Sequence, residues 1–199
     1  MITTWKHWHS AGWLGLAMVA GLLVWTVWAA TVPEPEAGLL IDDFSQTKNW
    51  RVYTDRALGG SSKGKQTFEP WEGGKVLHFT GTVLPGSEGG FLQTRRSLLT
   101  SGQPINASTY GGVQIEVKGN GEEYVLMLRT RNCRRSWEFY GMRFKPTADW
   151  QVFRLPFASF AAVGVGVPLD LTALTSVALA GLGNNQPVDL WAKEIRFYG

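Results

Sequence analysis

Short runs in which apolar and polar side chains alternate fill the chain from residue 39 onward. In residues 113–118, for example, Val or Ile occupies every odd position and Gln, Glu or Lys every even one. Side chains along a β-strand point alternately to opposite faces, so this period of two predicts strands with one buried face. The pattern predicts strands over 39–44, 49–54, 65–70, 74–83, 90–98, 111–119, 122–131, 136–145, 149–155, 173–181 and 188–198.

The connections between these runs are rich in turn residues. Gly119-Asn120-Gly121 separates two predicted strands and predicts a hairpin, because Asn and Gly tolerate positive φ. Residues 156–160 are predicted to form a helical turn, and 163–168 an exposed loop. Two glycine pairs, Gly59-Gly60 and Gly89-Gly90, are expected at backbone positions that a side chain would disturb. Many strands, close turns and no long amphipathic helix indicate an antiparallel sandwich or barrel.

The N-terminal segment has a different pattern. Residues 11–32 contain no charged side chain and, as a helix, would be long enough to cross a hydrocarbon core about 30 Å thick. Trp side chains gather near both ends of this run, and indole rings prefer the two membrane interfaces. We therefore predict a short tail (1–10), a transmembrane anchor (11–32), a Pro/Glu linker (33–38) and a β-sandwich binding domain (39–199).

A cleaved signal peptide is the alternative for this segment, with a small-residue cleavage site near residues 27–29. The apolar region of a signal peptide usually runs about 7–15 residues, so the longer run here favours an uncleaved anchor. Lys6 precedes the run and points to a cytoplasmic N-terminus by the positive-inside rule. The sequence thus predicts a single-pass protein of the inner (cytoplasmic) membrane with its domain in the periplasm.

Composition narrows the class of protein. The 199 residues include 10 Trp, 10 Phe and 24 Gly, with 18% charged residues, which suits short strands and tight turns and argues against disorder. The net charge of +3 is modest, so we expect no nucleic-acid partner. Cys133 is the single cysteine, which excludes an intrachain disulfide and a Cys-based metal site.

Catalytic motifs are weak. Residues 60–64 match the G-x-S-x-G string of serine hydrolases, but the strand–turn–helix context is missing and only His78 follows the string. No nucleophile–base pair can be assembled from so few histidines. We therefore expect a protein that is not an enzyme and has no catalytic residue.

Metal and cofactor sites have few candidates. Asp42 and Asp43 are weak candidates for Ca²⁺, which binds carboxylate oxygens, although an aspartate here, Asp55 included, is more simply expected to cap a turn. His7 and His9 stand just before the apolar run, where an imidazole could contact a tetrapyrrole ring, although polar residues at headgroup level are a simpler interpretation. We expect no bound cofactor.

Arginines and aromatic residues supply the candidate binding residues. Guanidinium groups beside aromatic rings suit recognition of a sugar, a carboxylate or a protein segment. Trp50 and Trp150, each followed by alternating hydrophobic residues, are instead expected in the core. The candidates for a binding surface are Arg95, Arg129, Arg131, Arg134, Arg135, Trp71, Trp137 and Tyr53.

An ordered set of motifs links the chain to a known family. The motifs are Asp42-Asp43-Phe44 with Trp50, Asp55 with Gly59-Gly60-Ser61-Ser62, the stretch 79–83, Gly89-Gly90-Phe91 with Arg95, the stretch 111–121 with Tyr124 and Arg129, and the stretch 150–157. In order and spacing they resemble the complex I intermediate-associated protein 30 family, over roughly residues 39–198. Members of that family are assembly factors for respiratory complex I, with relatives in bacteria and photosynthetic organisms. The resemblance implies a jelly-roll sandwich of the galactose-binding type and a binding domain without catalysis.

The expected function follows from the anchor and the resemblance together. We expect a membrane-anchored assembly factor or accessory subunit that binds protein components of a membrane energy-conversion complex, either respiratory and complex I-like or photosynthetic. The alternative is a membrane-tethered module that binds carbohydrate or the cell envelope. Exposed Trp71 and Trp137 flanking a groove would favour the alternative, whereas a flat, Arg-rich patch would favour a protein partner.

Overall fold

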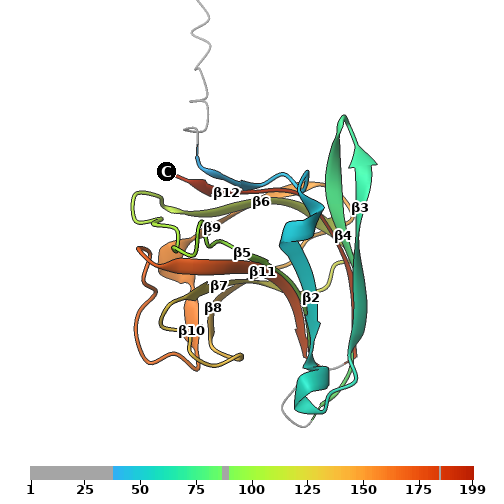
Figure 1. Ribbon diagram of the computed structural model, residues 1–199. Helices are drawn as coiled ribbons and strands as arrows, with labels where there is room; N and C mark the ends of the chain where they lie inside the picture. The colour runs from blue at the N-terminus through green and yellow to red at the C-terminus, as the bar shows by residue number, and fades with distance from the viewer. Residues whose placement is uncertain (1–37, 87–89, 184) are drawn as a thin grey trace, which may run out of the picture. The chain divides into compact units, whose positions relative to one another are not determined.

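The computed structural model describes residues 38–86, 90–183 and 185–199 of the chain. These residues form twelve β-strands in two antiparallel sheets that face each other, so the expected all-β sandwich is confirmed (Figure 1). The strands are β1 (Leu40–Asp42), β2 (Trp50–Thr54), β3 (Lys63–Trp71), β4 (Gly74–Val83), β5 (Gly90–Ser97), β6 (Gly112–Gly119), β7 (Tyr124–Thr130), β8 (Phe139–Phe144), β9 (Gln151–Pro156), β10 (Ala161–Val163), β11 (Leu174–Gly183) and β12 (Gln186–Tyr198). Three short 3₁₀ turns accompany them: η1 (Thr47–Asn49), η2 (Asp55–Leu58) and η3 (Phe157–Ser159).

Each sheet combines strands that lie far apart in the sequence. Sheet A has the order β3-β4-β12-β6-β9, with β1 paired to β12 beside this row. Sheet B has the order β10-β8-β7-β11-β5-β2. In Figure 1, β12, β6 and β9 form the upper layer, and β5, β11, β7 and β8 form the lower one. The chain therefore crosses repeatedly between the layers.

One of these crossings replaces the predicted hairpin at Gly119-Asn120-Gly121. β6 and β7 belong to different sheets, because both edges of β6 are occupied by β12 and β9. The turn residues pair with the β8–β9 connection instead: Gly119 N–H donates to the carbonyl of Thr147, and Gly121 N–H to that of Pro146. Gly121 does have a positive φ of 79°. The turn chemistry was thus predicted correctly, whereas the hairpin was wrong.

The core lies between the two sheets and is formed by the inward positions of the alternating runs. Leu77 and Phe79 of β4 and Ile115 of β6 meet Leu126 of β7 and Leu179 of β11 there, and all five are fully buried. Burying such side chains contributes about 1.5–3 kcal/mol each relative to leaving them exposed. The packed core therefore holds the two sheets together and fixes the positions of the side chains on their outer faces.

A bulge in β12 decides which of its side chains reach solvent. The register with β6 shifts between Ala192 and Glu194, and Ala192 and Ile195 consequently both point into the core. A bulge adds one residue and changes the alternation locally. Trp191 and Lys193 therefore lie on the outer face of sheet A.

Most predicted elements are found, with exceptions at the shortest ones. η3 confirms the helical turn expected at 156–160. The 3₁₀ turns η1 and η2 and the strand β10 were missed. β10 has all three side chains exposed, so it carries no alternation that could have predicted a strand.

Several sequence predictions concern residues outside the described part of the chain. They include the tail 1–10, the anchor 11–32 with His7 and His9 before it, the linker except for Gly38, and Gly89. Among residues 38–86, 90–183 and 185–199, no helix combines the length and apolar character that crossing a membrane requires.

Candidate binding surfaces

The outer face of sheet B collects several of the predicted binding residues. Arg51 and Tyr53 of β2, Arg95 of β5 and Arg129 of β7 point away from the core, because their neighbours in each strand point inward. We call this surface the arginine face. It brings together three of the candidate residues, Tyr53, Arg95 and Arg129, and adds Arg51, which was not among them.

A pocket of about 300 Å³ opens on the arginine face. The guanidinium of Arg95 lies over the ring of Tyr53, 4.1 Å from its centroid, and a cation over an aromatic ring is held by the ring's negative face. Arg51 stands directly opposite Arg95 in the ladder of β2 and β5. The pocket is lined by Asn49, Arg51, Tyr53, Arg95, Ser97, Arg129, Thr175 and Ser176, none of which is acidic.

Arg129 is tied to the β7–β8 loop. Its guanidinium donates hydrogen bonds to the carbonyls of Cys133 (3.3 Å), Arg135 (2.8 Å) and Ser136 (2.9 Å). Burial lowers the pKa of Arg129, and the nearby charge of Arg95 lowers it further. Arg129 therefore shapes the loop as well as lining the pocket, and its removal would alter both.

The β7–β8 loop itself presents exposed arginines at the rim of the arginine face. Glu138 accepts hydrogen bonds from the backbone N–H groups of Arg135 and Arg134, which lower its pKa. The guanidinium of Arg135 lies 5.6 Å from the ring centroid of Trp137, and Trp137 is 53% exposed. Arg131 donates to the side-chain oxygen of Gln103. The structure thus groups the four predicted loop residues Arg131, Arg134, Arg135 and Trp137 beside the pocket.

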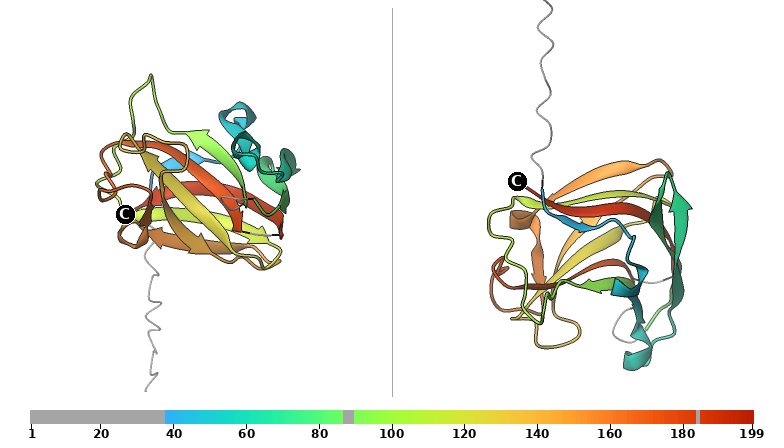
Figure 2. Two further views of the ribbon diagram at one scale, coloured as in Figure 1. Left: turned by 90° about the horizontal axis from the view of Figure 1, so that it is seen from below. Right: turned by 45° about the horizontal axis from the view of Figure 1, so that its top comes forward.

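An apolar floor continues from the pocket across the same face. Val125 and Met127 of β7 and Ala178 and Ala180 of β11 face outward, yet each is at least 93% buried. Sheet B is curved, and its outer face is the concave one (Figure 1). Figure 2 (left), seen from below, looks onto this layer. We call these four side chains the alanine floor, and neighbouring side chains cover almost all of their surface.

The outer face of sheet A carries a second cluster, which we call the tryptophan face. The rings of Trp71 and Trp150 meet edge to face, with centroids 5.5 Å apart. Lys193 Nζ lies 4.5 Å from the Trp150 centroid, and Lys118 Nζ lies 4.9 Å from that of Trp191. Trp71 is therefore separated from Trp137 and the arginine face by the whole thickness of the sandwich.

The position of Trp150 corrects the expectation that it belongs to the core. Trp50 is 3% exposed and lies in the core as predicted, but Trp150 is only half-buried and stands outside the core cluster. In β9 the inward positions are Phe153 and Leu155. Trp150 is an odd number of residues away from both, so the alternation of side chains along an extended chain points it outward.

His78 extends the tryptophan face toward acidic side chains. Its ring stacks on Trp191 with centroids 3.6 Å apart. Nδ1 lies 3.3 Å from a carboxylate oxygen of Glu69, and Nε2 lies 2.8 Å from one of Asp189. His78 therefore has no contact with Ser62 of the hydrolase-like string.

Ser62 belongs to a buried network around Asp55. The Ser62 hydroxyl donates to Asp55 Oδ2 at 2.5 Å, and the Ser62 N–H donates to Oδ1 at 3.0 Å. Phe91 N–H also donates to Oδ2, and Ser62 Oγ accepts from Leu84 N–H. The network connects η2 to the β4–β5 region. Ser62 therefore has a structural role and is not placed as a nucleophile.

Asp42 and Asp43, the weak calcium candidates, are engaged in turns. Asp42 Oδ1 accepts from Phe44 N–H at 2.6 Å, and its Oδ2 accepts from Trp50 Nε1 and from Arg96. Asp43 accepts from Ser45 N–H, and the hydrogen bonds from Ser45 lower its pKa. Among the described residues, no group of three or more His, Cys, Asp and Glu side chains gathers that could hold a metal ion.

The predicted structural glycines have distinct surroundings. Gly59 has a φ of 79° and open space where a Cβ would stand. A Cβ on Gly60 would lie 2.2 Å from Asp55 Cγ, and one on Gly90 would lie 2.1 Å from the carbonyl oxygen of Leu84. Positive φ at the first position and lack of space at the other two each favour glycine.

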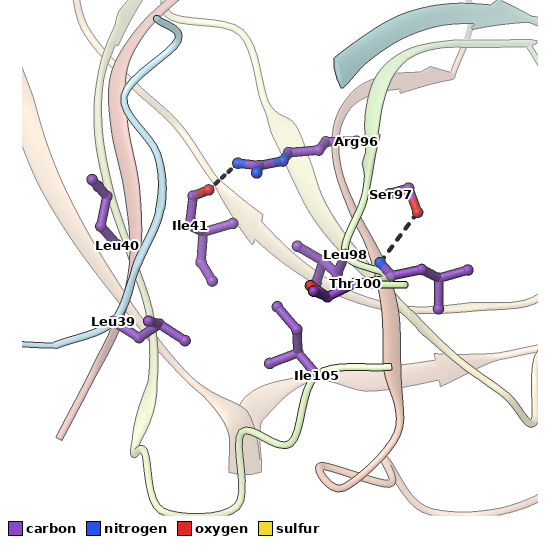
Figure 3. Close-up of a pocket in the computed structure, with 9 residues that line it drawn as sticks. Leu39, Leu40, Ile41, Arg96, Ser97, Leu98, Thr100 and Ile105 are labelled. Carbon is purple, nitrogen blue, oxygen red and sulfur yellow. Dashed lines mark hydrogen bonds between the residues drawn. The ribbon is translucent and has the colours of Figure 1, made fainter. Parts of the chain in front are cut away.

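A smaller pocket of about 230 Å³ lies beside β1 (Figure 3). Leu98 and Ile105 stand on one side of it, and Leu39 and Leu40 on the other (Figure 3). Arg96 donates to the Ile41 carbonyl at its edge. Leu39 and Leu40 are 40% and 46% exposed, and the lining mixes such leucines with Arg96, Ser97 and Thr100.

Comparison with known proteins gives one family and a group of similar folds. The model of the family described as complex I intermediate-associated protein 30 matches residues 40–186. A search of the curated proteins finds no match.

Several of the similar solved structures are carbohydrate-binding modules. A family 11 module of a cellulosomal cellulase of Clostridium thermocellum superposes with a TM-score of 0.67 at 20% identity, over 81% of this chain and 94% of that one. The family 11 module from the same organism in complex with a β-1,3-1,4-mixed-linked tetrasaccharide gives 0.64 at 20% identity, over 81% and 95%. A family 30 module of another cellulosomal cellulase of that organism gives 0.52 at 17% identity, over 70% and 91%. At these identities the similarity establishes a common sandwich fold.

Proposed function

Because this chain belongs to the complex I intermediate-associated protein 30 family, we propose that it is a non-enzymatic assembly factor or accessory subunit that binds protein components of a membrane energy-conversion complex. The family match over residues 40–186 carries this proposal, since it spans almost all of the described sandwich. The complex is respiratory and complex I-like or photosynthetic. The sandwich is of the jelly-roll, galactose-binding type.

The arrangement of side chains favours binding over catalysis. The only serine of the hydrolase-like string with a carboxylate partner, Ser62, is fully buried against Asp55. His78 lies several residues away along the β3–β4 hairpin and is held there by two carboxylates. A nucleophile needs a base within hydrogen-bond reach and access to substrate. The arginine face, by contrast, offers Arg51 and Tyr53 at its surface, and Arg and Tyr are enriched in protein interfaces.

A membrane anchor at residues 11–32 would supply localisation. It would hold the sandwich near its client and so raise the effective concentration of the binding surface. We place the N-terminus in the cytoplasm and the sandwich in the periplasm, on the strength of Lys6.

This anchor predicts that the protein stays in the membrane fraction after alkaline carbonate washing and that the mature chain keeps its N-terminus. Both properties follow from an uncleaved apolar span. Immunoblotting of the washed pellet and mass spectrometry of the N-terminal peptide are the measurements. Release by carbonate, or a mature chain that starts near Ala30, would contradict the anchor.

The client is predicted to co-purify with the full chain. Tagged protein solubilised from native membranes in mild detergent should enrich several subunits or assembly intermediates of one energy-conversion complex, as identified by mass spectrometry. A tagged single-pass membrane protein of unrelated sequence is the control. If both baits recover the same abundant membrane proteins, the assembly function is wrong.

A carbohydrate-binding module is the second candidate. It is favoured by the similarity to carbohydrate-binding modules, one of them in complex with a tetrasaccharide, and by the pocket on sheet B with Tyr53 at its edge. Retardation of the full chain in gels that contain cell-envelope polysaccharide, lost on Tyr53→Ala, would support this candidate. Unchanged mobility with every polysaccharide would remove it.

A further inference from the structure

We propose that the pocket formed by Arg51, Tyr53, Arg95 and Arg129 binds a carboxylate side chain presented by an extended segment of the protein partner. The inference rests on the proposed function, because that function supplies the protein partner. It identifies the docking point and the chemistry of the segment that docks there.

The first observation is positive charge without a neighbouring counterion. Arg51 and Arg95 are direct cross-strand neighbours, and like charges in that position repel. Within the described residues, neither guanidinium has a carboxylate at ion-pair distance, whereas Arg96, Arg143 and Arg196 each have one. The remaining lining groups are hydroxyls, an amide and a phenol, and no carboxylate. A bound anion would relieve this repulsion, which no described side chain of the sandwich does.

The second observation is that the pocket is organised before any ligand arrives. The Tyr53 ring supports the plane of the Arg95 guanidinium at 4.1 Å. Arg129 is fixed by three loop carbonyls and stands on the far side of the pocket, where the charge of Arg95 contributes to lowering its pKa. Because Nη2 of Arg129 is occupied by two of these carbonyls, Arg129 contributes charge rather than a free fork. The guanidinium of Arg95, which the Tyr53 ring supports, loses little entropy on binding and matches the two oxygens of a carboxylate.

The third observation selects an extended peptide as the carrier of the carboxylate. Ser176 lines the pocket, and the next outward positions along β11 are Ala178 and Ala180 of the alanine floor. Alternate residues of an extended chain are about 7 Å apart, which equals the spacing of these positions. A partner strand that runs along β11 would therefore place an acidic residue over the pocket. Its residues two and four positions away would pass over Ala178 and Ala180, whose small side chains are almost fully covered and do not obstruct that path.

The rim adds long-range attraction for such a segment. Arg131, Arg134 and Arg135 are exposed beside the pocket. Clustered positive charge accelerates the encounter with an acidic partner. This attraction weakens as salt rises, because the Debye length falls from about 10 Å at 0.1 M to about 3 Å at 1 M.

The test uses the full chain in detergent and a synthetic nonapeptide, Val-Ser-Val-Ser-Glu-Ser-Val-Ser-Val, acetylated and amidated so that glutamate carries its only charge. Its symmetry serves both strand directions. We expect saturable binding by isothermal titration that is lost when glutamine replaces the glutamate. The double variant Arg51→Gln with Arg95→Gln should weaken binding about tenfold or more. The matched control is Arg154→Gln, which removes a positive charge from the outer face of sheet A and should leave the affinity unchanged.

Three results would overturn the inference. They are no binding at about 1 mM peptide, equal affinity for the glutamate and glutamine peptides, and equal affinity of wild type and the double variant. A uronic-acid oligosaccharide is titrated in parallel, and if it binds at the arginines while the peptide does not, the carboxylate comes from a polysaccharide and the peptide segment is wrong. Co-purification of the client is read separately: client recovery without peptide binding refutes only this docking point, whereas a bait that recovers no client refutes the proposed function.

Discussion

Replacing Asp55 by alanine is expected to lower the free energy of unfolding by about 3–5 kcal/mol, because hydrogen bonds to a charged group contribute about 1.5–3 kcal/mol each and several are lost together. Asp55 is 1% exposed and accepts from Ser62 Oγ, Ser62 N–H and Phe91 N–H. Alanine leaves three buried donors without an acceptor and a cavity in place of the carboxylate. Because these donors come from the β2–β3 connection and from β5, the loss is expected to loosen one end of the sandwich.

Denaturant unfolding of the full chain, followed by Trp fluorescence, measures this effect. The matched control is Asp43→Ala, since Asp43 is exposed and caps a turn through Ser45. Loss of such a cap should cost about 1 kcal/mol. If the two variants are destabilised equally, the buried network contributes no more than a surface turn, and the structural role given to Asp55 is wrong.

Among the predicted structural glycines Gly59, Gly60 and Gly90, Gly90→Ala is expected to lower the free energy of unfolding most, by about 3 kcal/mol or more, because overpacking without room to relax reaches that size. The added Cβ would lie 2.1 Å from the carbonyl oxygen of Leu84 and 2.8 Å from that of Gly183. Both obstacles are backbone atoms, so no side-chain rotation can give way. Gly90 also pairs with Gly183 at the start of the β5–β11 ladder.

Gly59→Ala provides the contrast for this prediction. Nothing lies within 4 Å of its Cβ position, and only the positive φ of 79° opposes a side chain. That strain is worth about 1 kcal/mol. Thermal and denaturant unfolding of the two variants should therefore rank Gly90→Ala well below Gly59→Ala in stability. The reverse order would show that β5 can shift away from Leu84 and that the close approach is not required.

The outer faces show why local patterns identify candidate residues better than candidate sites. Tyr53, Arg95 and Arg129 were singled out for their chemistry, and the alternation within each strand already turns them away from the core. Their meeting depends on β5 pairing with both β2 and β11, and on β7 pairing with β11. Trp71 has the same chemistry but stands on β3 in the other sheet.

Trp150 and Arg129 illustrate two further limits of the sequence. The parity of β9 could have placed Trp150 outside the core, since it is out of phase with Phe153 and Leu155. At that position the parity of the strand outweighs the hydrophobicity of the side chain. For Arg129, no pattern indicates that its guanidinium binds three carbonyls of its own loop. Such contacts depend on the folded path of the loop.

By itself the sequence determined the all-β class, the course of nearly every strand, the helical turn at η3 and the family, because period-two alternation and turn chemistry are local properties. Only the tertiary structure decided which strands share a sheet. The crossing at Gly121 is the clearest case, since the local turn is compatible with a hairpin while both edges of β6 are occupied by β9 and β12. Pairings between distant strands are chosen by burial of the whole core, and so the arginine face and the tryptophan face emerge only when the two sheets have formed.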